Sequence, residues 1–242
     1  METVYVGYPH GGKIDGDFAD CLDALHIWEV ENPSPRYKVV GFRGEKGPYV
    51  QENRNVLVRR MRDAGADWLF QLDPDETFEP NLLRVLMRHA AAERPILTGL
   101  YSNIGNVEVD GQGSFEVVDM VFAEVPSGEY QNLQIPADLQ PFEVHACGAG
   151  VLLVHRSVFE TMEYPWFRLG YIVPEGAAGP QVMNEDIAFC RDVRELGFHI
   201  WCDPLAVVSH WKIVPLVPSV VQRMIEQAEQ VRGEMADVAR RD

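Results

Sequence analysis

The feature that most constrains the fold is the alternation of short apolar runs with amphipathic segments over the first hundred residues. The apolar runs predict strands, and the segments between them show the helical spacing of apolar side chains. The order predicts parallel strands covered by helices, because helical crossovers connect parallel strands. The expected strands are residues 3–7, 37–41, 68–72 and 96–100, and the expected helices are residues 17–30, 52–64 and 81–91.

The rest of the chain has a different pattern. Residues 101–142 are rich in Gly, Asn and Pro and contain one strand-like run, residues 115–123. A loop is expected over residues 163–183, and loops of that length are usually functional or disordered. The other expected elements are strands over 148–155, 199–202 and 206–209, helices over 156–162 and 184–196, and a terminal helix from residue 218 to about 239.

Charge and composition exclude some classes of function. The formal net charge of −16 argues against broad binding to nucleic acid phosphates. No apolar run approaches the roughly 20 residues of a membrane span. The N-terminus lacks a basic stretch followed by an apolar segment, so no secretory signal is expected. The cysteines lack a Cys-x-x-Cys pair and are interpreted as buried or free thiols of a cytoplasmic protein, with a zinc site as the alternative. They are Cys21, Cys147, Cys190 and Cys202.

Two carboxylates, Asp73 and Asp75, come directly after the predicted strand 68–72. Ligands of open α/β sheets gather in the crevice beyond the carboxyl ends of the strands. Mg²⁺ and Mn²⁺ prefer oxygen ligands and bridge carboxylates to phosphates, so this pair predicts a divalent metal site. A second Asp-x-Asp string, at Asp15 and Asp17, opens a helix and is interpreted as an N-cap.

A second group of candidate residues lies in the other half of the chain. Glu185 and Asp186 open a predicted helix, where the helix dipole by itself favours acidic residues. The long loop that leads into them favours a functional role instead. His210 ends a predicted strand and is a candidate third metal ligand. Trp166, Phe167 and Tyr171 of the loop are interpreted either as a surface that stacks on a sugar or as anchors to the core.

Five phrases in this order resemble the GT-A glycosyltransferases, and most of all the family 2-like, non-processive enzymes of bacteria and phages. They span residues 4–212 together with the strands between them. The phrases are Glu52-Asn53-Arg54-Asn55, Leu72-Asp73-Pro74-Asp75, Gly148-Ala149-Gly150, Asn184-Glu185-Asp186 and Ser209-His210.

The resemblance implies a mixed α/β sheet flanked by helices, in one catalytic domain over residues 1–212. Residues 1–100 would form the nucleotide-binding half and residues 101–212 the acceptor half. Residues 213–242 would form a C-terminal helical extension, through which a homo-oligomer is a further hypothesis. The implied donor is a nucleoside-diphosphate-sugar, either a UDP- or a GDP-sugar, and the implied cofactor is Mn²⁺ or Mg²⁺.

The resemblance also implies a role for each candidate residue. Asp73, Asp75 and His210 would hold the metal, and Asp186 would be the catalytic base of an inverting transfer. The other roles follow in order: Pro9 and His10 at the nucleoside, Arg54 and Asn55 near the ribose or diphosphate, Gly148, Ala149 and Gly150 close to the sugar or acceptor, and Glu185 at the acceptor.

Some features depart from the resemblance or leave alternatives open. The Gln-x-x-Arg-Trp phrase and membrane helices of processive members are missing, which disfavours polymer synthesis and export. Residues 101–142 and 163–183, the expected acceptor region, match no family pattern. The residues from Pro9 to Lys13 partly resemble a phosphate-binding loop, so a sugar-phosphate nucleotidyltransferase is one alternative. A non-catalytic carbohydrate-binding or assembly protein on the same scaffold is the other.

Overall fold

A computed structural model describes residues 1–109, 112–173 and 179–210. The predicted helical extension over 213–242 lies outside the described residues, and so does part of the predicted loop. The helices are α1 (Gly16–Glu31), α2 (Val50–Asp63), α3 (Leu82–Met87), α4 (Arg156–Thr161) and α5 (Glu185–Glu195). The strands are β1 (Glu2–His10), β2 (Tyr37–Lys46), β3 (Trp68–Leu72), β4 (Glu76–Phe78), β5 (Ile96–Leu100), β6 (Ser102–Val109), β7 (Gln112–Asp119), β8 (Val121–Glu124), β9 (Tyr130–Asn132), β10 (Phe142–Val144), β11 (Ala146–Cys147), β12 (Val151–His155), β13 (Gly170–Ile172), β14 (Gln181–Met183) and β15 (Ile200–His210).

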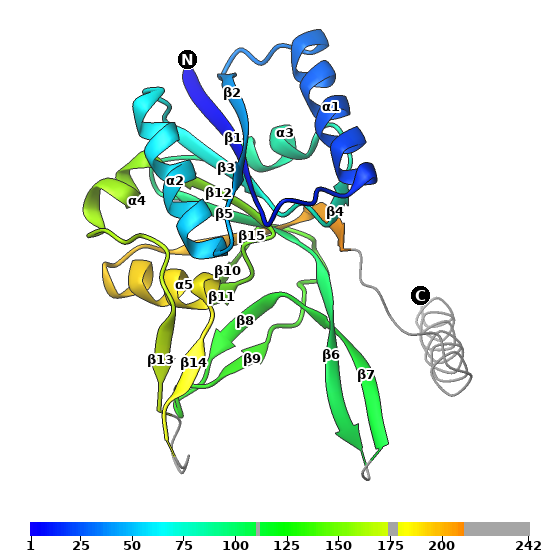
Figure 1. Ribbon diagram of the computed structural model, residues 1–242, viewed down its shortest axis with the longest axis vertical. Coiled ribbons are helices and arrows are strands. Elements are labelled where there is room, and N and C mark those ends of the chain that lie inside the picture. Colours follow the sequence, from blue (N-terminus) through cyan, green and yellow to red (C-terminus); the bar gives the residue numbers. More distant parts are fainter. Residues whose placement is uncertain (110–111, 174–178, 211–242) are drawn as a thin grey trace. The chain divides into compact units, whose positions relative to one another are not determined.

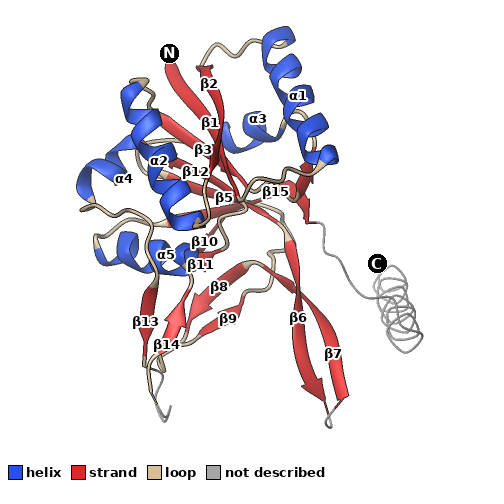
Figure 2. Cartoon of the chain, in the orientation of Figure 1, coloured by secondary structure: helices blue, strands red, loops and turns tan. Residues whose placement is uncertain are grey.

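A mixed sheet forms the centre of the described part of the chain, with the strand order β10-β15-β5-β12-β3-β1-β2 (Figure 2). Strand β1 is parallel to both β2 and β3, and β15 is parallel to β5. Strand β12 lies between β3 and β5 and is antiparallel to both. The predicted parallel arrangement of the first four strands is therefore confirmed, with one antiparallel strand inserted among them.

Helices cover both faces of this sheet (Figure 1). Side chains alternate along β3, because successive residues of a strand point to opposite faces. Leu69 packs in one core with Leu57 of α2 and Phe189 of α5. Trp68 and Phe70 pack in the second core, with α1 and α3. The sheet is thus buried on both faces, which explains why its strands read as continuous apolar runs.

Three predicted elements differ from the structure. Residues 163–183 were expected to be a loop, but they contain the antiparallel hairpin β13–β14. Residues 101–123 hold the hairpin β6–β7 and the strand β8 in place of one strand-like run. Both hairpins are two-stranded sheets outside the main sheet, so their sequences lack the apolar runs of buried strands. The two strands expected over 199–202 and 206–209 form one strand, β15 (Ile200–His210), which is interrupted by a register shift between Cys202 and Val207.

The topology brings distant segments to one edge of the sheet. Parallel strands β1 and β3 end there, at His10 and Leu72. Because β12 is antiparallel to β3, the residues just before β12 lie beside the residues just after β3. The N–H of Asp73 donates to the carbonyl of Gly150 at 2.8 Å. Strand β4 then pairs with the end of β15, so that Glu76 lies opposite His210.

Within residues 1–109, 112–173 and 179–210, the helices lack the combination of length and apolar character that a membrane crossing needs.

We expect Gly99 of β5, in the centre of the sheet, to tolerate substitution poorly. A Cβ there would clash with the backbone carbonyl of Ala206 and press on Val151. We expect Gly99→Ala to lower the free energy of unfolding by about 1–3 kcal/mol, the usual cost of overpacking a core. Gly16→Ala is the matched control, because a Cβ at Gly16 has open space around it within the described part of the chain. Urea unfolding measures both, and equal stability of the two variants would contradict the packing.

Candidate active site

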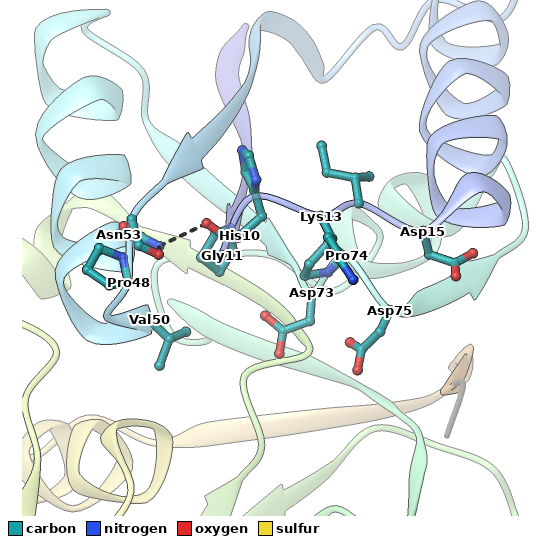
Figure 3. Close-up of a pocket in the computed structure, with 13 residues that line it drawn as sticks. His10, Gly11, Lys13, Asp15, Pro48, Val50, Asn53, Asp73, Pro74 and Asp75 are labelled. Carbon is teal, nitrogen blue, oxygen red and sulfur yellow. Dashed lines mark hydrogen bonds between the residues drawn. The ribbon is translucent and has the colours of Figure 1, made fainter. Parts of the chain in front are cut away.

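A cavity of about 560 Å³ lies where β1 and β3 end (Figure 3). Its size is within the range of pockets that bind small-molecule ligands. Predicted residues and residues that the sequence did not single out line it together. They include Pro9, His10, Lys13, Asp15, Asn53, Asp73, Pro74 and Asp75.

The carboxylates of Asp73 and Asp75 point to the same side of the turn after β3, with Pro74 between them (Figure 3). The Oδ2 atom of Asp75 lies 3.0 Å from Nε2 of His210. His210 reaches this position because the end of β15 pairs with β4, the strand that directly follows the turn. The structure therefore brings the three predicted metal ligands to one edge of the sheet.

The guanidinium of Arg54 lies beneath the site and is 2% exposed. Its Nη2 donates to Oδ1 of Asp73 at 2.8 Å, and its Nε donates to Oε1 of Glu185 at 3.2 Å. Its Nη1 donates to the carbonyl of Ala149 at 3.2 Å. We predicted Arg54 near the ribose or diphosphate and Glu185 at the acceptor. In the structure the two side chains form a buried ion pair with each other, so both stabilise the arrangement of the site.

Asn55 is fully buried one residue further along α2. Its amide donates to the carbonyl of Phe167 at 2.8 Å and accepts from the N–H of Phe167 at 3.0 Å. Both ends of the amide are thus occupied by one loop residue. Asn55 was also predicted near the ribose or diphosphate, and this geometry assigns it the task of fixing the chain after α4.

The aromatic residues of the predicted loop divide into two groups. Trp166 is 5% exposed, and its indole N–H donates to the carbonyl of Phe159 at 2.9 Å. Phe167 stacks on Phe189, with ring centroids 4.6 Å apart. These two side chains anchor the loop to the core, which was one of the two interpretations of the sequence. Tyr171 is 63% exposed on the hairpin β13–β14.

Asp186 lies in the first turn of α5 and is partly buried. Burial and the neighbouring carboxylate of Glu185 raise the pKa of Asp186 to about 6, although the N–H of Ile187 donates to its Oδ1 at 2.8 Å. A carboxylate with a pKa near 6 can accept a proton at neutral pH more readily than an ordinary aspartate. Since Glu185 is bound to Arg54, the base candidate is held close to Asp73.

Glu76 is a buried carboxylate that the sequence did not single out. It is fully buried in β4, and neither of its carboxylate oxygens makes a hydrogen bond with another described residue. Burial, with Asp73 and Asp75 nearby, raises the pKa of Glu76 well above its usual range. The nearby positive charge of Arg54 opposes this change. An acidic centre with more carboxylates than guanidinium groups is a favourable environment for a cation.

The donor set fits a divalent cation in its chemistry. Carboxylate oxygens suit Mg²⁺ and Mn²⁺, and imidazole is a further ligand for transition metals. Among the residues that the structure describes, no three His, Cys, Asp or Glu side chains are grouped closely enough to hold a metal by themselves. Asp75 and His210 face each other here, with Oδ2 of the carboxylate 3.0 Å from Nε2 of the imidazole.

The three-residue segment Gly148–Gly150 needs its glycines for contacts inside the protein. A Cβ on Gly148 would clash with the hydroxyl of Tyr101, and a Cβ on Gly150 would clash with Oε1 of Glu76. The predicted close approach of a sugar or acceptor is therefore not required to explain the glycines. Ala149 between them is buried and accepts the hydrogen bond from Arg54.

Several site residues were not predicted, and some of them had a signal in the sequence. Lys13 follows two glycines directly after β1, and it was considered only as the end of a phosphate-binding loop in the nucleotidyltransferase alternative. Asp15 accepts from the N–H of Asp17 at 2.9 Å, as expected of an N-cap, and also lines the cavity. Asn53 donates to the carbonyl of Gly47 at 3.1 Å and so closes the cavity wall. Tyr101 had no local signal, because its contacts are all distant in the sequence.

Three solved structures are similar to this chain. A crystal structure of GalNAc-T7 with UDP, GalNAc and Mn²⁺ matches with a TM-score of 0.57 and 13% sequence identity. The match covers 87% of this chain and 43% of the GalNAc-T7 chain. The protein A197 from STIV matches with a TM-score of 0.46 and 15% identity, over 90% of this chain and 98% of that chain. A glycosyltransferase involved in glycosylation of the major capsid of PBCV-1 matches with a TM-score of 0.35 and 13% identity, over 67% and 69%.

No protein family model and no curated protein matches the sequence. The mixed sheet flanked by helices and the GalNAc-T7 match together confirm the predicted GT-A-like fold for the described residues. The C-terminal helix that was part of the same prediction lies outside them.

Removal of Arg54 tests how the site is held together. Arg54→Met leaves the buried carboxylate of Glu185 and the partly buried carboxylate of Asp73 without a counter-charge. The loss of one partner of a buried ion pair costs about 3–5 kcal/mol. Arg60→Met is the control, because Arg60 pairs with Glu45 nearer the surface and such pairs contribute about 0–1 kcal/mol. We expect this difference in urea unfolding at neutral pH. A loss below 1 kcal/mol for Arg54→Met would show that Arg54 does not stabilise the site.

Proposed function

We propose that this chain is a metal-dependent glycosyltransferase that transfers a sugar from a nucleoside-diphosphate-sugar to an acceptor hydroxyl. One observation carries the proposal: Arg54 binds Asp73 of the candidate cation site and Glu185, the neighbour of the candidate base Asp186. The groups needed for donor activation and for proton removal are thereby held at one edge of the sheet. A family 2-like, non-processive enzyme with one catalytic domain over residues 1–212 is the finer form of this proposal.

The cavity beyond β1 and β3 is the proposed donor site. Its lining includes Pro9, His10 and Lys13 together with Asp73 and Asp75. A nucleoside would lie beside Pro9 and His10, and its diphosphate would lie between Lys13 and the cation site. GalNAc-T7, which has the same fold, was crystallised with UDP and Mn²⁺, so these are the first ligands to test.

Asp75 and His210 would hold Mn²⁺ or Mg²⁺, with Asp73 oriented by Arg54. A bound divalent cation neutralises the charge that develops on a leaving diphosphate. Phosphate oxygens of a bound donor would supply further ligands to the cation. A bound cation would favour the charged form of the buried Glu76 carboxyl group, whose pKa is raised by burial and by the neighbouring Asp73 and Asp75.

Asp186 would accept the proton of the acceptor hydroxyl as that hydroxyl attacks the anomeric carbon. Direct attack on the face opposite the leaving diphosphate inverts the anomeric centre. The base acts from the start of α5, and the hairpin β13–β14 leads into that helix. We therefore assign the acceptor side of the site to this helix start.

One observation favours a second candidate, a sugar-phosphate nucleotidyltransferase. Lys13 follows Gly11 and Gly12 at the end of β1 and lines the same cavity as Asp75. A nucleotidyltransferase needs such a cation for a triphosphate. Release of pyrophosphate from a nucleoside triphosphate and a sugar phosphate would favour this candidate, whereas release of a nucleoside diphosphate from a donor sugar favours the transferase.

Asp75→Ala tests the cation site. We expect it to abolish the Mn²⁺-dependent part of UDP binding, because the variant lacks one of the two side chains, Asp75 and His210, that would bind the cation. Calorimetry with UDP, with and without Mn²⁺, measures the effect. Asp17→Ala is a matched control from the second Asp-x-Asp string, and it should bind UDP and Mn²⁺ as the wild type does. Unchanged Mn²⁺-dependent affinity in Asp75→Ala would refute the cation assignment.

Asp186→Asn tests the base. We expect UDP binding to persist while turnover falls by roughly 10²–10⁴-fold, the usual contribution of a general base. In the wild type, turnover should rise with pH through about 6, because the deprotonated carboxylate is the active form. Near-normal turnover of the variant would exclude Asp186 as the base.

The same pKa predicts a stability effect of known sign. The folded protein holds the proton of Asp186 more tightly than the unfolded chain does, because the pKa is raised from 3.8 to about 6. Its contribution to stability is therefore lost as pH rises from about 4 to about 6. Asp186→Asn should lose this part of the pH dependence in urea unfolding experiments.

A further inference from the structure

Tyr101 lies between β5 and β6 and is buried. It lies beside both arms of the candidate cation site, which are the turn that carries Asp73 and Asp75 and the end of β15 that carries His210. Its hydroxyl accepts a hydrogen bond from the N–H of Gly150 at 3.2 Å. The carbonyl of Gly150 in turn accepts from the N–H of Asp73 at 2.8 Å. Through one glycine, the tyrosine hydroxyl is thus connected to the backbone that carries the first carboxylate of the site.

The ring of Tyr101 supports the other arm. It contacts the imidazole of His210 edge-on, with ring centroids 5.6 Å apart and an interplanar angle of 76°. The direction of that imidazole matters for the cation, because Nε2 of His210 lies 3.0 Å from Oδ2 of Asp75. A shift of the tyrosine ring would therefore change the direction in which the histidine points.

The surroundings leave Tyr101 little freedom to shift. A Cβ on Gly148 would clash with its hydroxyl, and a Cβ on Gly150 would press on its ring carbon Cζ. On its own backbone, the carbonyl of Tyr101 accepts from the N–H of Met120 at 2.9 Å, at the base of the hairpin β6–β7. The absence of side chains at the two glycines is what makes room for this one tyrosine.

We propose that Tyr101 is a positioning residue of the cation site, which holds Asp73 through Gly150 and holds His210 through direct ring contact. This inference rests on the proposed function, since it concerns the same site. Partners that orient the ligands of a metal contribute to its affinity without touching the metal. Tyr101 contacts both sides of this site: it accepts from the N–H of Gly150, which is hydrogen-bonded to Asp73, and its ring packs against His210.

Tyr101→Phe removes the hydroxyl and leaves the ring. The N–H of Gly150 then loses its acceptor in a buried place, and the backbone at Asp73 is held less firmly. We expect Mn²⁺ affinity, measured by calorimetry in the presence of UDP, to fall by about 10-fold to 100-fold. UDP affinity in EDTA should stay within about twofold of the wild type, since the inference concerns only binding of the cation.

Tyr37→Phe is the matched control. Tyr37 is a buried tyrosine whose hydroxyl donates to Glu29 at 2.8 Å and accepts from Arg84 at 3.1 Å, in the core on the α1 side. It should lower the midpoint of thermal unfolding as Tyr101→Phe does, with Mn²⁺ affinity unchanged. Gly148→Ala is a second perturbation, because its methyl group displaces the hydroxyl of Tyr101. It should weaken Mn²⁺ binding in the same way. Mn²⁺ affinity in the double variant, which combines Tyr101→Phe with Gly148→Ala, should be no lower than in the more severely affected single variant.

Three results would overturn the inference, and they differ from one another. Wild-type affinity in Tyr101→Phe and Gly148→Ala, with Mn²⁺ bound by the wild type, removes the role of Tyr101 alone. Equal weakening in Tyr37→Phe shows general loosening of the core and also removes it. Failure of the wild type to bind Mn²⁺ in the presence of UDP removes the proposed metal dependence, and the inference with it.

Discussion

The structure of the site depends on one buried cation, the guanidinium of Arg54. Burying a guanidinium is unfavourable unless its hydrogen bonds and charge are matched. Here Asp73, Glu185 and the carbonyl of Ala149 supply that match from three segments that are distant in the sequence. The ion pair therefore fixes the end of β3, the residues before β12 and the start of α5 relative to one another.

The balance of charge around Arg54 also supports the proposed cation site. Asp73, Asp75 and Glu76 follow β3 within four residues, and Glu185 adds a further carboxylate. One guanidinium does not neutralise this group, and Glu76 has no hydrogen-bond partner among the described residues. The raised pKa of Asp186 has a related cause, since burial and the neighbouring carboxylates disfavour its charged form.

The sequence predicted the features that depend on local pattern. Apolar runs located the buried strands β3 and β5 with their observed bounds, and the turn after β3 placed Asp73 and Asp75 at the sheet edge. The hairpins β6–β7 and β13–β14 were missed because a two-stranded sheet outside the core needs no continuous apolar run. Pattern alone could not separate a buried arginine from a ligand-binding one, because both follow the same helical spacing. The structural role of Arg54 follows only from its ion pairs with Asp73 and Glu185, which are distant in the sequence.

Residues defined by long-range contacts were the least predictable. Tyr101 meets Gly150 and His210, and neither contact has a local sequence signature. Lys13 and Asp15 are different, because they stand directly after β1 and were assessed on local grounds alone. For Asp15 the N-cap interpretation was compatible with the structure and still incomplete, since the same side chain borders the cavity.

The place of β12 and β15 in the sheet has a consequence for how the polypeptide acquires its structure. Strand β12 separates β3 from β5, and β15 covers the far side of β5. The first hundred residues therefore emerge from the ribosome without the strands that complete their sheet, and such non-local pairing slows folding. Until residues 151–155 are synthesised, the edges of β3 and β5 remain open to mispairing. Expression of the first half alone should for this reason yield aggregates in place of a nucleotide-binding fragment.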